Sequence, residues 1–387
     1  MTIAQATSSD SDSAQAAREV VGSVKEKLGG ERPSLAFYFV SNHHVPQLDD
    51  TAQTLAEELG ATHVLGCTGE SIIGGDVEYE ERPAFSLWAG TFPGAEIGSA
   101  HLTFEQTPDG FVFLGIPAMP SGPATLLLLG EPYTFPTDAF IKRMAEDYPE
   151  LQVLGGMSSG ASNPGENRLF LGSEVLMEGA VAAVVSGGTR VRPLVSQGCR
   201  PFGKRLVITK AEQNFILAIG GRPAFEKLSE QLQELTPHER ELLERGPHVG
   251  IAIDAGKEQY RRGDFLVRNI IGIRREDGAI AVTDMVKPGL TIQYHLRDAE
   301  TASEDLQVLL REAHFSGAQP QGALLFSCNG RGRRLFDVPN HDAATVTREL
   351  GEIPLAGFFA AGEIGPVGGQ NFLHGFTASL ALFEEST

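Results

Sequence analysis

One pattern of apolar and polar positions occurs three times along the chain. An apolar run that predicts a buried strand is followed by a stretch with helical spacing, and then by a second apolar run that enters a glycine-rich loop. The paired runs begin at residues 34 and 63, at 125 and 152, and at 323 and 354, so their offsets are 29, 27 and 31 residues. Each loop places glycine, serine, cysteine or glutamate at a strand end. The repeat therefore predicts several loops that converge on shared ligand sites.

The segments around these runs predict the rest of the secondary structure. After its loop, each copy reaches a further apolar run, at residues 84–89, 180–185 and 377–383. Helical spacing predicts helices at residues 14–28, 50–59, 138–148, 223–235 and 302–315. Residues 1–12 are small and polar, and we expect them to be disordered. Residues 193–201 have the composition of a connector.

Short runs broken by glycine and proline interrupt the repeats and predict antiparallel strands. We therefore expect an α/β (mixed α+β) protein in which mixed β-sheets are covered by helices. Residues 1–30 hold the disordered tail and a short helix. Two domains follow, at residues 31–204 and 205–387.

Composition narrows the function classes. The chain has 387 residues and a net charge of −19, a field that repels nucleic acid. No apolar stretch approaches the ~18 residues that a membrane-spanning helix needs. The three cysteines form no CxxC pair and the histidines form no metal-binding motif, so we expect no disulfide framework, no metal and a cytoplasmic location. Phosphate-loop and dinucleotide-binding motifs are absent from the sequence, so we expect no cofactor.

The segment Ser327-Cys-Asn-Gly-Arg-Gly-Arg333 follows an apolar strand and is the first candidate for chemistry. Its glycines allow backbone N–H groups to face a ligand, and Arg331 or Arg333 can bind a carboxylate through two hydrogen bonds. Cys328 is a candidate nucleophile or redox sensor if a guanidinium lowers its pKa, with His341 or His374 as base. The alternative is a tight turn in which Cys328 packs as a small apolar residue.

The other loops offer carboxylates and hydroxyls. Gly69-Glu70 and Gly362-Glu363 occupy equivalent places in the first and third copies, and two such carboxylates can recognise an ammonium group or act as an acid–base pair. They can equally accept hydrogen bonds from loop amides. Ser158 and Ser159 have hydroxyls that suit polar ligand atoms or the capping of the turn itself.

These blocks resemble the FIST family, named for F-box and intracellular signal transduction proteins. The resemblance covers residues 32–385. Its first half rests on Leu65-Gly-Cys-Thr-Gly-Glu70 and Leu154-Gly-Gly-Met-Ser-Ser159. Its second half rests on Ser327-Cys-Asn-Gly-Arg-Gly332, Gly357-Phe-Phe-Ala-Ala-Gly-Glu363 and His374-Gly-Phe-Thr377. It implies a sensory protein that binds small ligands such as amino acids. The sequence carries no attached output module, so we expect action through a separate signalling protein.

The leading hypothesis is therefore a small-ligand sensor for amino acids or small carboxylates, with neither a nucleic acid nor a membrane as partner. The predicted ligand-binding residues are Gly69, Glu70, Ser158, Ser159, Ser327, Cys328, Asn329, Arg331, Arg333, Gly362, Glu363 and His374. Two alternatives stay open. One is a hydrolase or transferase that uses Cys328 or the Glu70 and Glu363 carboxylates, and the other is an interaction scaffold or adaptor.

Overall fold

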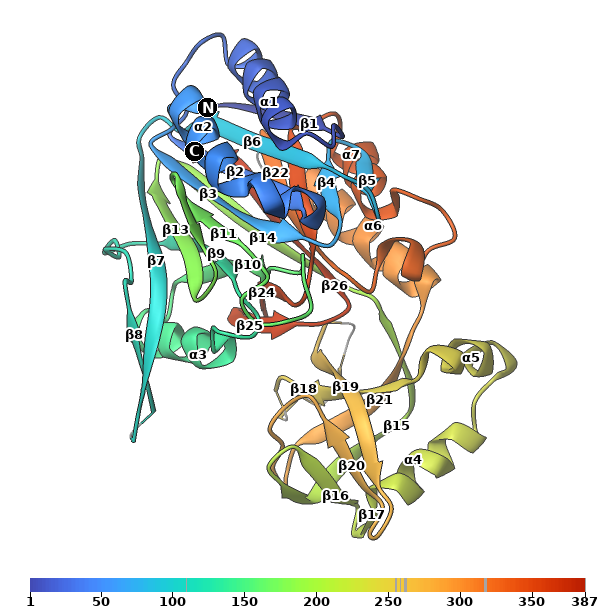
Figure 1. The fold of residues 1–387 in the computed structure, drawn as a ribbon. Coiled ribbons are helices and arrows are strands. Elements are labelled where there is room, and N and C mark those ends of the chain that lie inside the picture. Colours follow the sequence, from blue (N-terminus) through green and yellow to red (C-terminus); the bar gives the residue numbers. More distant parts are fainter. Residues whose placement is uncertain (109, 255, 258, 261–262, 317–318, 387) are drawn as a thin grey trace. The chain divides into compact units, whose positions relative to one another are not determined.

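The computed structural model describes residues 1–386 except 109, 255, 258, 261–262 and 317–318. It forms two compact units: unit 1 comprises Met1–Ser196, Leu306–Leu373 and Thr377–Thr387, and unit 2 comprises Gln197–Asp305 and His374–Phe376 (Figure 1). The units do not follow a linear division at residue 204. The third copy of the repeat folds with the first two in unit 1, and most of unit 2 is inserted before that copy in the sequence. The predicted architecture of mixed sheets covered by helices is confirmed.

Each copy of the repeat forms the centre of its own sheet. Its first and second strands are parallel and are joined by a helix. The first copy contains β2 (Leu35–Ser41), α2 (Leu48–Leu59) and β3 (His63–Gly69). The second contains β9 (Ala124–Gly130), α3 (Thr137–Asp147) and β10 (Gln152–Met157). The third contains β22 (Gly322–Cys328), α7 (His341–Leu350) and β23 (Leu355–Ala360).

The apolar run that ends each copy returns to the first strand of the same copy. These returning strands are β6 (Phe85–Thr91), β13 (Ala180–Gly187) and β26 (Thr377–Glu385). They pair antiparallel with β2, β9 and β22, respectively. Outside them lie β1 (Thr2–Ser8), the hairpin of β7 (Ala95–Thr107) and β8 (Gly110–Leu114), and β14 (Thr189–Gln197). The strand patterning of the repeat is therefore the same three times.

The short hairpin after each glycine-rich loop leaves its own sheet and joins another. The hairpin of β4 (Ile72–Gly74) and β5 (Val77–Tyr79) comes from the first copy but pairs with β23 of the third. The hairpin of β11 (Leu169–Leu171) and β12 (Glu174–Leu176) comes from the second copy and pairs with β3. The hairpin of β24 (Glu363–Val367) and β25 (Gln370–His374) comes from the third copy and pairs with β10. This cyclic exchange ties the three sheets together.

One glycine per copy is required by close packing of the parallel strands. Gly66, Gly155 and Gly357 lie beside Tyr38, Leu128 and Leu325 of the neighbouring strand. A Cβ atom at these glycines would lie 2.2, 1.9 and 1.8 Å from the carbonyl oxygens of those three neighbours. No side chain fits at that distance, so the three glycines mark corresponding positions in the copies.

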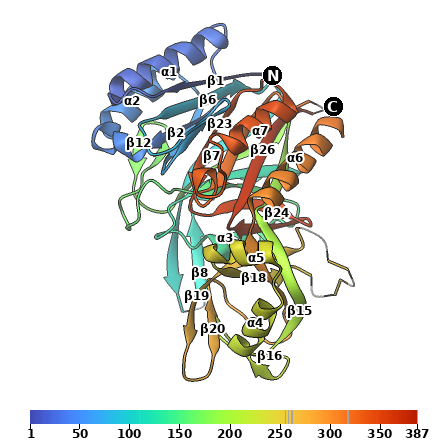
Figure 2. The ribbon, with the colours of Figure 1, turned by 90° about the vertical axis from the view of Figure 1, so that its right-hand side faces the viewer.

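The inner faces of the three sheets share one apolar core, and helices cover the outer faces. Phe37, Trp88, Leu127, Phe326 and Phe358 belong to the shared core, and each is almost fully buried. On the outer face of the first sheet, α2 packs beside α1 (Ser13–Lys27), as Figure 2 shows. On the third sheet, α7 and α6 (Ala299–Phe315) contribute to a second apolar layer.

The N-terminal segment differs from its expected disorder. Residues 2–8 form β1, which pairs antiparallel with β6 from Thr2 opposite Thr91 to Ser8 opposite Phe85. Ala4, Ala6 and Ser8 alternate along the strand and are buried, so small side chains supply the inward face. The helix expected next is confirmed as α1, whose N-cap Asp12 accepts a hydrogen bond from the backbone N–H of Gln15.

The connector predicted at residues 193–201 is also wrong, because that segment lies in β14 and in β15 (Cys199–Glu212). Pro193 and Pro201 hid these strands from the sequence pattern. Strand β14 is an end strand of its sheet, and Pro201 precedes residues 208–212, the part of β15 that pairs with β16. Proline is tolerated at such positions because fewer backbone N–H groups are needed for pairing.

Unit 2 is built around a single sheet. In spatial order its strands are β15, β21 (Thr291–Arg297), β18 (Pro247–Ala252), β19 (Phe265–Arg274), β20 (Ala279–Val282), β16 (Phe215–Ile219) and β17 (Arg222–Pro223). A further pairing of β15 with β16 closes the ring of strands. Helix α4 (Ala224–Gln233) adds Ala224 and Leu228 to the core, and α5 (Pro237–Leu242) begins with a capping box at Thr236. Within the described part of the chain, no helix has the length and apolar composition to cross a bilayer.

Candidate functional site

The glycine-rich loops of the three copies meet, as the repeat predicts. The backbone N–H of Ser159 in the second loop donates to the Thr68 carbonyl oxygen of the first loop over 3.2 Å. Met157 exchanges backbone hydrogen bonds of 2.8 and 2.9 Å with residues 361–362 of the third loop. The N–H of Phe359 donates to the Ser71 carbonyl oxygen over 2.9 Å, which closes the circuit. The exchanged hairpins place these chain ends side by side.

The serine hydroxyls hold this junction together. Ser158 Oγ donates to the Thr68 carbonyl oxygen over 2.6 Å and lies 3.1 Å from the Thr68 hydroxyl. Ser159 Oγ donates to the Phe359 carbonyl oxygen and accepts from the Glu70 backbone N–H over 2.9 Å. Both side chains are buried. Their hydroxyls are therefore bonded to neighbouring loops of the chain itself.

Glu70 and Glu363 are not structural equivalents, which corrects the expectation from the sequence. Glu70 lies four residues after Gly66, whereas Glu363 lies six residues after the corresponding Gly357. The Glu70 side chain is about one-third exposed and forms an ion pair with Arg334. Glu363 is fully buried at the start of β24. The two carboxylates have different partners and different environments.

The two carboxyl oxygens of Glu363 differ in their hydrogen bonds. Its Oε2 accepts hydrogen bonds from the Thr377 backbone N–H (3.0 Å) and hydroxyl (2.8 Å). Its Oε1 is buried and has no hydrogen-bond partner that meets standard geometry among the described residues. Burial raises the pKa of Glu363 to about 8, although hydrogen bonds from Thr377 and Cys328 and the charge of Arg331 act in the opposite direction. At neutral pH this carboxyl group is therefore largely protonated.

Arg331 is buried and bound to a carboxylate of its own chain. Its Nε and Nη2 donate to the two carboxylate oxygens of Asp342 over 2.7 and 2.8 Å. Ser327 Oγ donates to Asp342 as well, over 2.7 Å, and His341 Nδ1 lies 2.9 Å from the same carboxylate. Arg331 Nη1 is buried without a partner among the described residues. Two of the donors expected to bind a ligand carboxylate are therefore occupied by Asp342.

Sequence reasoning missed Asp342 and Glu78. Glu78 lies on β5, and its Oε1 accepts hydrogen bonds from the backbone N–H groups of Asp342 (2.8 Å) and Ala343 (3.0 Å) in the first turn of α7. Burial and the neighbouring Asp342 charge raise the pKa of Glu78 to about 8. Burial alone would raise the pKa of Asp342, but the charge and hydrogen bonds of Arg331 hold it below its usual value. An acid in the first turn of a helix was a usable signal for Asp342. Glu78 lies in a three-residue strand and gave no such signal in the sequence.

The remaining residues of the Ser327–Arg333 segment differ in exposure. Cys328 Sγ accepts a hydrogen bond from the Gly330 backbone N–H over 3.5 Å, and the residue is 6% exposed. The Asn329 backbone N–H donates to the Ala360 carbonyl oxygen over 2.9 Å. The Arg333 side chain is 66% exposed, and its backbone N–H donates to Glu80 over 3.1 Å.

The last two predicted residues lie in different units. Gly362 belongs to unit 1, where its carbonyl oxygen accepts the Met157 N–H. His374 is buried and belongs to unit 2.

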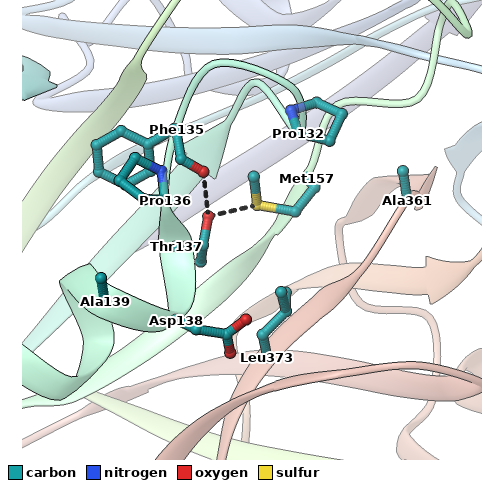
Figure 3. A pocket seen from close by; sticks show the side chains of 9 residues that line it. All are labelled: Pro132, Phe135, Pro136, Thr137, Asp138, Ala139, Met157, Ala361 and Leu373. Carbon is teal, nitrogen blue, oxygen red and sulfur yellow. Dashed lines mark hydrogen bonds between the residues drawn. The ribbon is translucent and has the colours of Figure 1, made fainter. Parts of the chain in front are cut away.

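A pocket of about 390 Å³ lies at the strand ends of the second copy, and none of its lining residues was among the predicted ligand-binding residues. Its apolar lining includes Phe135, Met157 and Leu373, with Thr137 and Asp138 from the first turn of α3 (Figure 3). Thr137 Oγ1 contacts Met157 Sδ at 3.2 Å. The other lining residues are Pro132, Pro136, Ala139 and Ala361. Met157 and Ala361 belong to the loop junction, so the pocket borders it.

In the third copy, the corresponding place is filled by a side chain from the hairpin of the first copy. Helices α3 and α7 both carry Asp-Ala as their second and third residues, at 138–139 and at 342–343. At α7, the exchanged hairpin supplies the Glu78 carboxylate to the first-turn amides. At α3, the exchanged hairpin supplies Leu373, and the pocket is open. One position of the repeat is thus closed by a carboxylate in one copy and open in another.

Unit 2 holds a grouping with the spacing of metal ligands, formed by His238, Asp298 and Glu300, whose ligand atoms lie within 4.8 Å of one another. Asp298 is already bound by Arg200 Nε at 2.9 Å and by the Thr301 hydroxyl at 2.6 Å. The guanidinium charge beside this carboxylate disfavours a cation there.

Comparison with known proteins agrees with the resemblance. The FIST N domain matches residues 34–222, and the FIST C domain matches residues 224–366. Similar proteins include uncharacterized protein Rv0628c of Mycobacterium tuberculosis, which is 40% identical over 384 residues, 99% of this chain and 100% of the relative. Uncharacterized protein Mb0898c of Mycobacterium bovis is 40% identical over 373 residues, 96% of each chain. FIST domains are sensory domains of signal transduction. The chain belongs to the FIST family, with its N and C domains arranged in sequence.

Proposed function

We propose that this protein senses a small organic molecule, either a free amino acid or a small carboxylic acid, which binds in the pocket at the start of α3. The observation that carries the proposal is the pocket itself, which lies at the C-terminal ends of parallel strands and borders the junction of the three loops. Ligands of α/β proteins bind preferentially at such strand ends. A volume of about 390 Å³ is within the usual range for small-molecule sites.

The lining suits a molecule with an apolar part and charged ends. Phe135, Met157 and Leu373 offer apolar surface, and Thr137 and Asp138 offer polar atoms (Figure 3). An ionised carboxylate accepts several hydrogen bonds, so the Asp138 side chain can receive a ligand ammonium in addition to its present contacts. This combination favours an amino acid over a purely apolar ligand.

The internal repeat supports a carboxylate at the other end of the ligand. In the third copy, the first-turn amides of α7 bind the Glu78 carboxylate. The start of α3 has the same Asp-Ala sequence, and the partial positive charge of a helix N-terminus favours an anion. We therefore propose that a ligand carboxylate lies at α3 as the Glu78 carboxylate lies at α7.

The loop residues predicted from sequence form the second part of this proposal. Ser158 and Gly362 are sequence neighbours of the pocket residues Met157 and Ala361, and they bond the loops to one another. A ligand that presses on Met157 or Ala361 acts on backbone atoms shared by the second and third loops. We propose that this change at the junction is what a separate signalling protein detects.

Isothermal titration calorimetry of the full chain against amino acids and small carboxylic acids tests the proposal. Ala139→Leu, which adds bulk to the pocket lining, should weaken a bound ligand at least about tenfold. Ala145→Leu, the same substitution at an exposed position of the same helix, should leave the affinity unchanged. A ligand that binds both variants as tightly as the unchanged chain, or the absence of binding by either class, contradicts the proposal.

A further inference from the structure

Two side chains near Cys328 each have a buried polar atom that lacks a hydrogen-bond partner of standard geometry among the described residues. These atoms are Glu363 Oε1 and Arg331 Nη1. Cys328 lies opposite Ala360 at the ends of β22 and β23, with Arg331 three residues after Cys328 and Glu363 three residues after Ala360. Glu363 and Arg331 each interact electrostatically with Cys328. Unsatisfied buried atoms are costly and concentrate where a group from outside is received. Here a thiol, an acid and a guanidinium come together.

We propose that Cys328 is a peroxide-reactive thiol that hydrogen peroxide or a small alkyl hydroperoxide oxidises to a sulfenic acid, with Glu363 as the proton carrier and Arg331 as the donor to the peroxide oxygen. This proposal does not depend on the ligand pocket at α3, because it uses different residues and a different reactant.

The sulfur lies among groups that stabilise a thiolate. The Gly330 backbone N–H points to Sγ over 3.5 Å, and the Arg331 guanidinium contributes positive charge. A hydrogen-bond donor and a cation beside a sulfur atom stabilise negative charge on it. Cys67 is the opposite case, because complete burial raises the pKa of its thiol well above the usual value.

Access to Cys328 is narrow. Its exposed fraction is 6%, against 0% for Cys67 and 2% for Cys199. So small an exposed fraction favours reaction with a small molecule such as a peroxide over reaction with a bulky electrophile. The limited access therefore favours a small oxidant, and a peroxide oxygen can accept a hydrogen bond from the Arg331 guanidinium.

The reaction balances with the groups present. The thiol proton passes to water, and the sulfur attacks one peroxide oxygen. The S–O bond forms as the O–O bond breaks; sulfur is oxidised by two electrons and the peroxide is reduced. Glu363, which is largely protonated at neutral pH, gives its proton to the departing oxygen and regains one from water, so that R–SH and R′OOH become R–SOH and R′OH. The N–H of Arg331 Nη1 stabilises the charge on the oxygen during the transfer.

The full chain supplies its own controls, because Cys67 and Cys199 are present in the same molecule. The reduced protein is treated with hydrogen peroxide, sulfenic acid is trapped with a cyclic 1,3-dione, and each cysteine peptide is quantified over time by mass spectrometry. We expect Cys328 to be trapped at least tenfold faster than either other cysteine. Equal or slower trapping of Cys328 in the folded, unsubstituted protein overturns the proposal.

Glu363→Gln separates proton transfer from access. Alkylation by iodoacetamide involves no departing oxygen, so its rate serves as the reference for how reachable and how ionised the thiol is in each protein. We expect the ratio of the peroxide rate to the alkylation rate at Cys328 to fall about tenfold in Glu363→Gln. An unchanged ratio, in a variant that unfolds at the same temperature as the unsubstituted chain, shows that Glu363 is not the proton carrier and overturns that part of the proposal.

Discussion

Arg331 and Asp342 form a doubly hydrogen-bonded ion pair in which the two side chains are 1% and 0% exposed. The pair joins the loop after β22 to the first turn of α7. Ser327 donates a hydrogen bond to the same carboxylate, so Ser327 and Arg331 both bind the first turn of α7 through Asp342. Arg331 therefore holds the loop to α7 through Nε and Nη2, whereas its Nη1 has no hydrogen-bond partner among the described residues.

The first prediction concerns this pair. Asp342→Ala should lower the free energy of unfolding by about 3–5 kcal/mol, because it leaves the Arg331 charge buried without its partner. Arg331→Met combined with Asp342→Leu should cost much less, since it removes both charges and keeps the volume filled. Urea denaturation followed by circular dichroism measures both. If the single substitution costs no more than the double one, the pair does not neutralise a buried charge as described.

A second prediction concerns pH. The folded-state pKa of Glu363 is about 8, above the value of about 4.3 for an unfolded chain, so the folded protein binds more protons between these limits. Its stabilising contribution is complete below about pH 4.3 and is lost as the pH rises through 8, by at most about 1.4 kcal/mol per pH unit. Glu78, whose pKa is also about 8, acts in the same direction. Urea midpoints measured from pH 5.5 to 8.5 should therefore fall with rising pH.

Glu363→Gln provides the control for this pH dependence, because the amide oxygen can still accept from Thr377 but the side chain does not titrate. The variant should lose less stability over the same pH range and become the more stable protein at pH 8.5. Parallel curves for the two proteins would show that Glu363 titrates at the same pH in the folded and unfolded chains.

A third prediction concerns the close approach of the parallel strands. Gly357→Ala should lower the free energy of unfolding by about 3 kcal/mol or more, because the new Cβ would lie 1.8 Å from the Leu325 carbonyl oxygen and the strands must separate. Gly22→Ala is the control: Gly22 lies within α1 and has nothing within 4 Å of the added carbon. It should stabilise the chain by about 0.5–1 kcal/mol, as alanine does in a helix. A mild effect of Gly357→Ala would argue against this strand packing.

Much of the secondary structure follows from local pattern. The apolar runs at residues 34, 125 and 323 become first strands, and the helices expected at residues 50–59 and 138–148 appear within a few residues of those bounds as α2 and α3. A fully buried strand and an amphipathic helix are each encoded by neighbouring residues. The segments that failed, residues 1–8 and 193–201, carry small residues or prolines, and their partners lie far away in the sequence.

The chemistry of the loops was less predictable. Glycine-rich strand ends correctly indicated that the three loops meet, and the identity of Arg331 and Glu363 indicated charge at that junction. The hydrogen-bond partners at this site could not be predicted from the sequence, because Asp342 is 11 residues from Arg331 and Glu78 is 264 residues from Asp342. The pocket at α3 is lined by residues such as Ala139 and Ala361, whose types carry no chemical signal by themselves.

The sequence by itself determined the threefold strand–helix–strand repeat and the polar character of the loops, because each depends on residues close together in the chain. Only the tertiary structure decided that every hairpin joins another copy's sheet. Backbone hydrogen bonds are the same for any pair of strands, so three-residue strands such as β4 and β11 carry almost no information about their partner. That choice is made by packing in the shared core, and it determines which carboxylate closes α7 and which pocket stays open at α3.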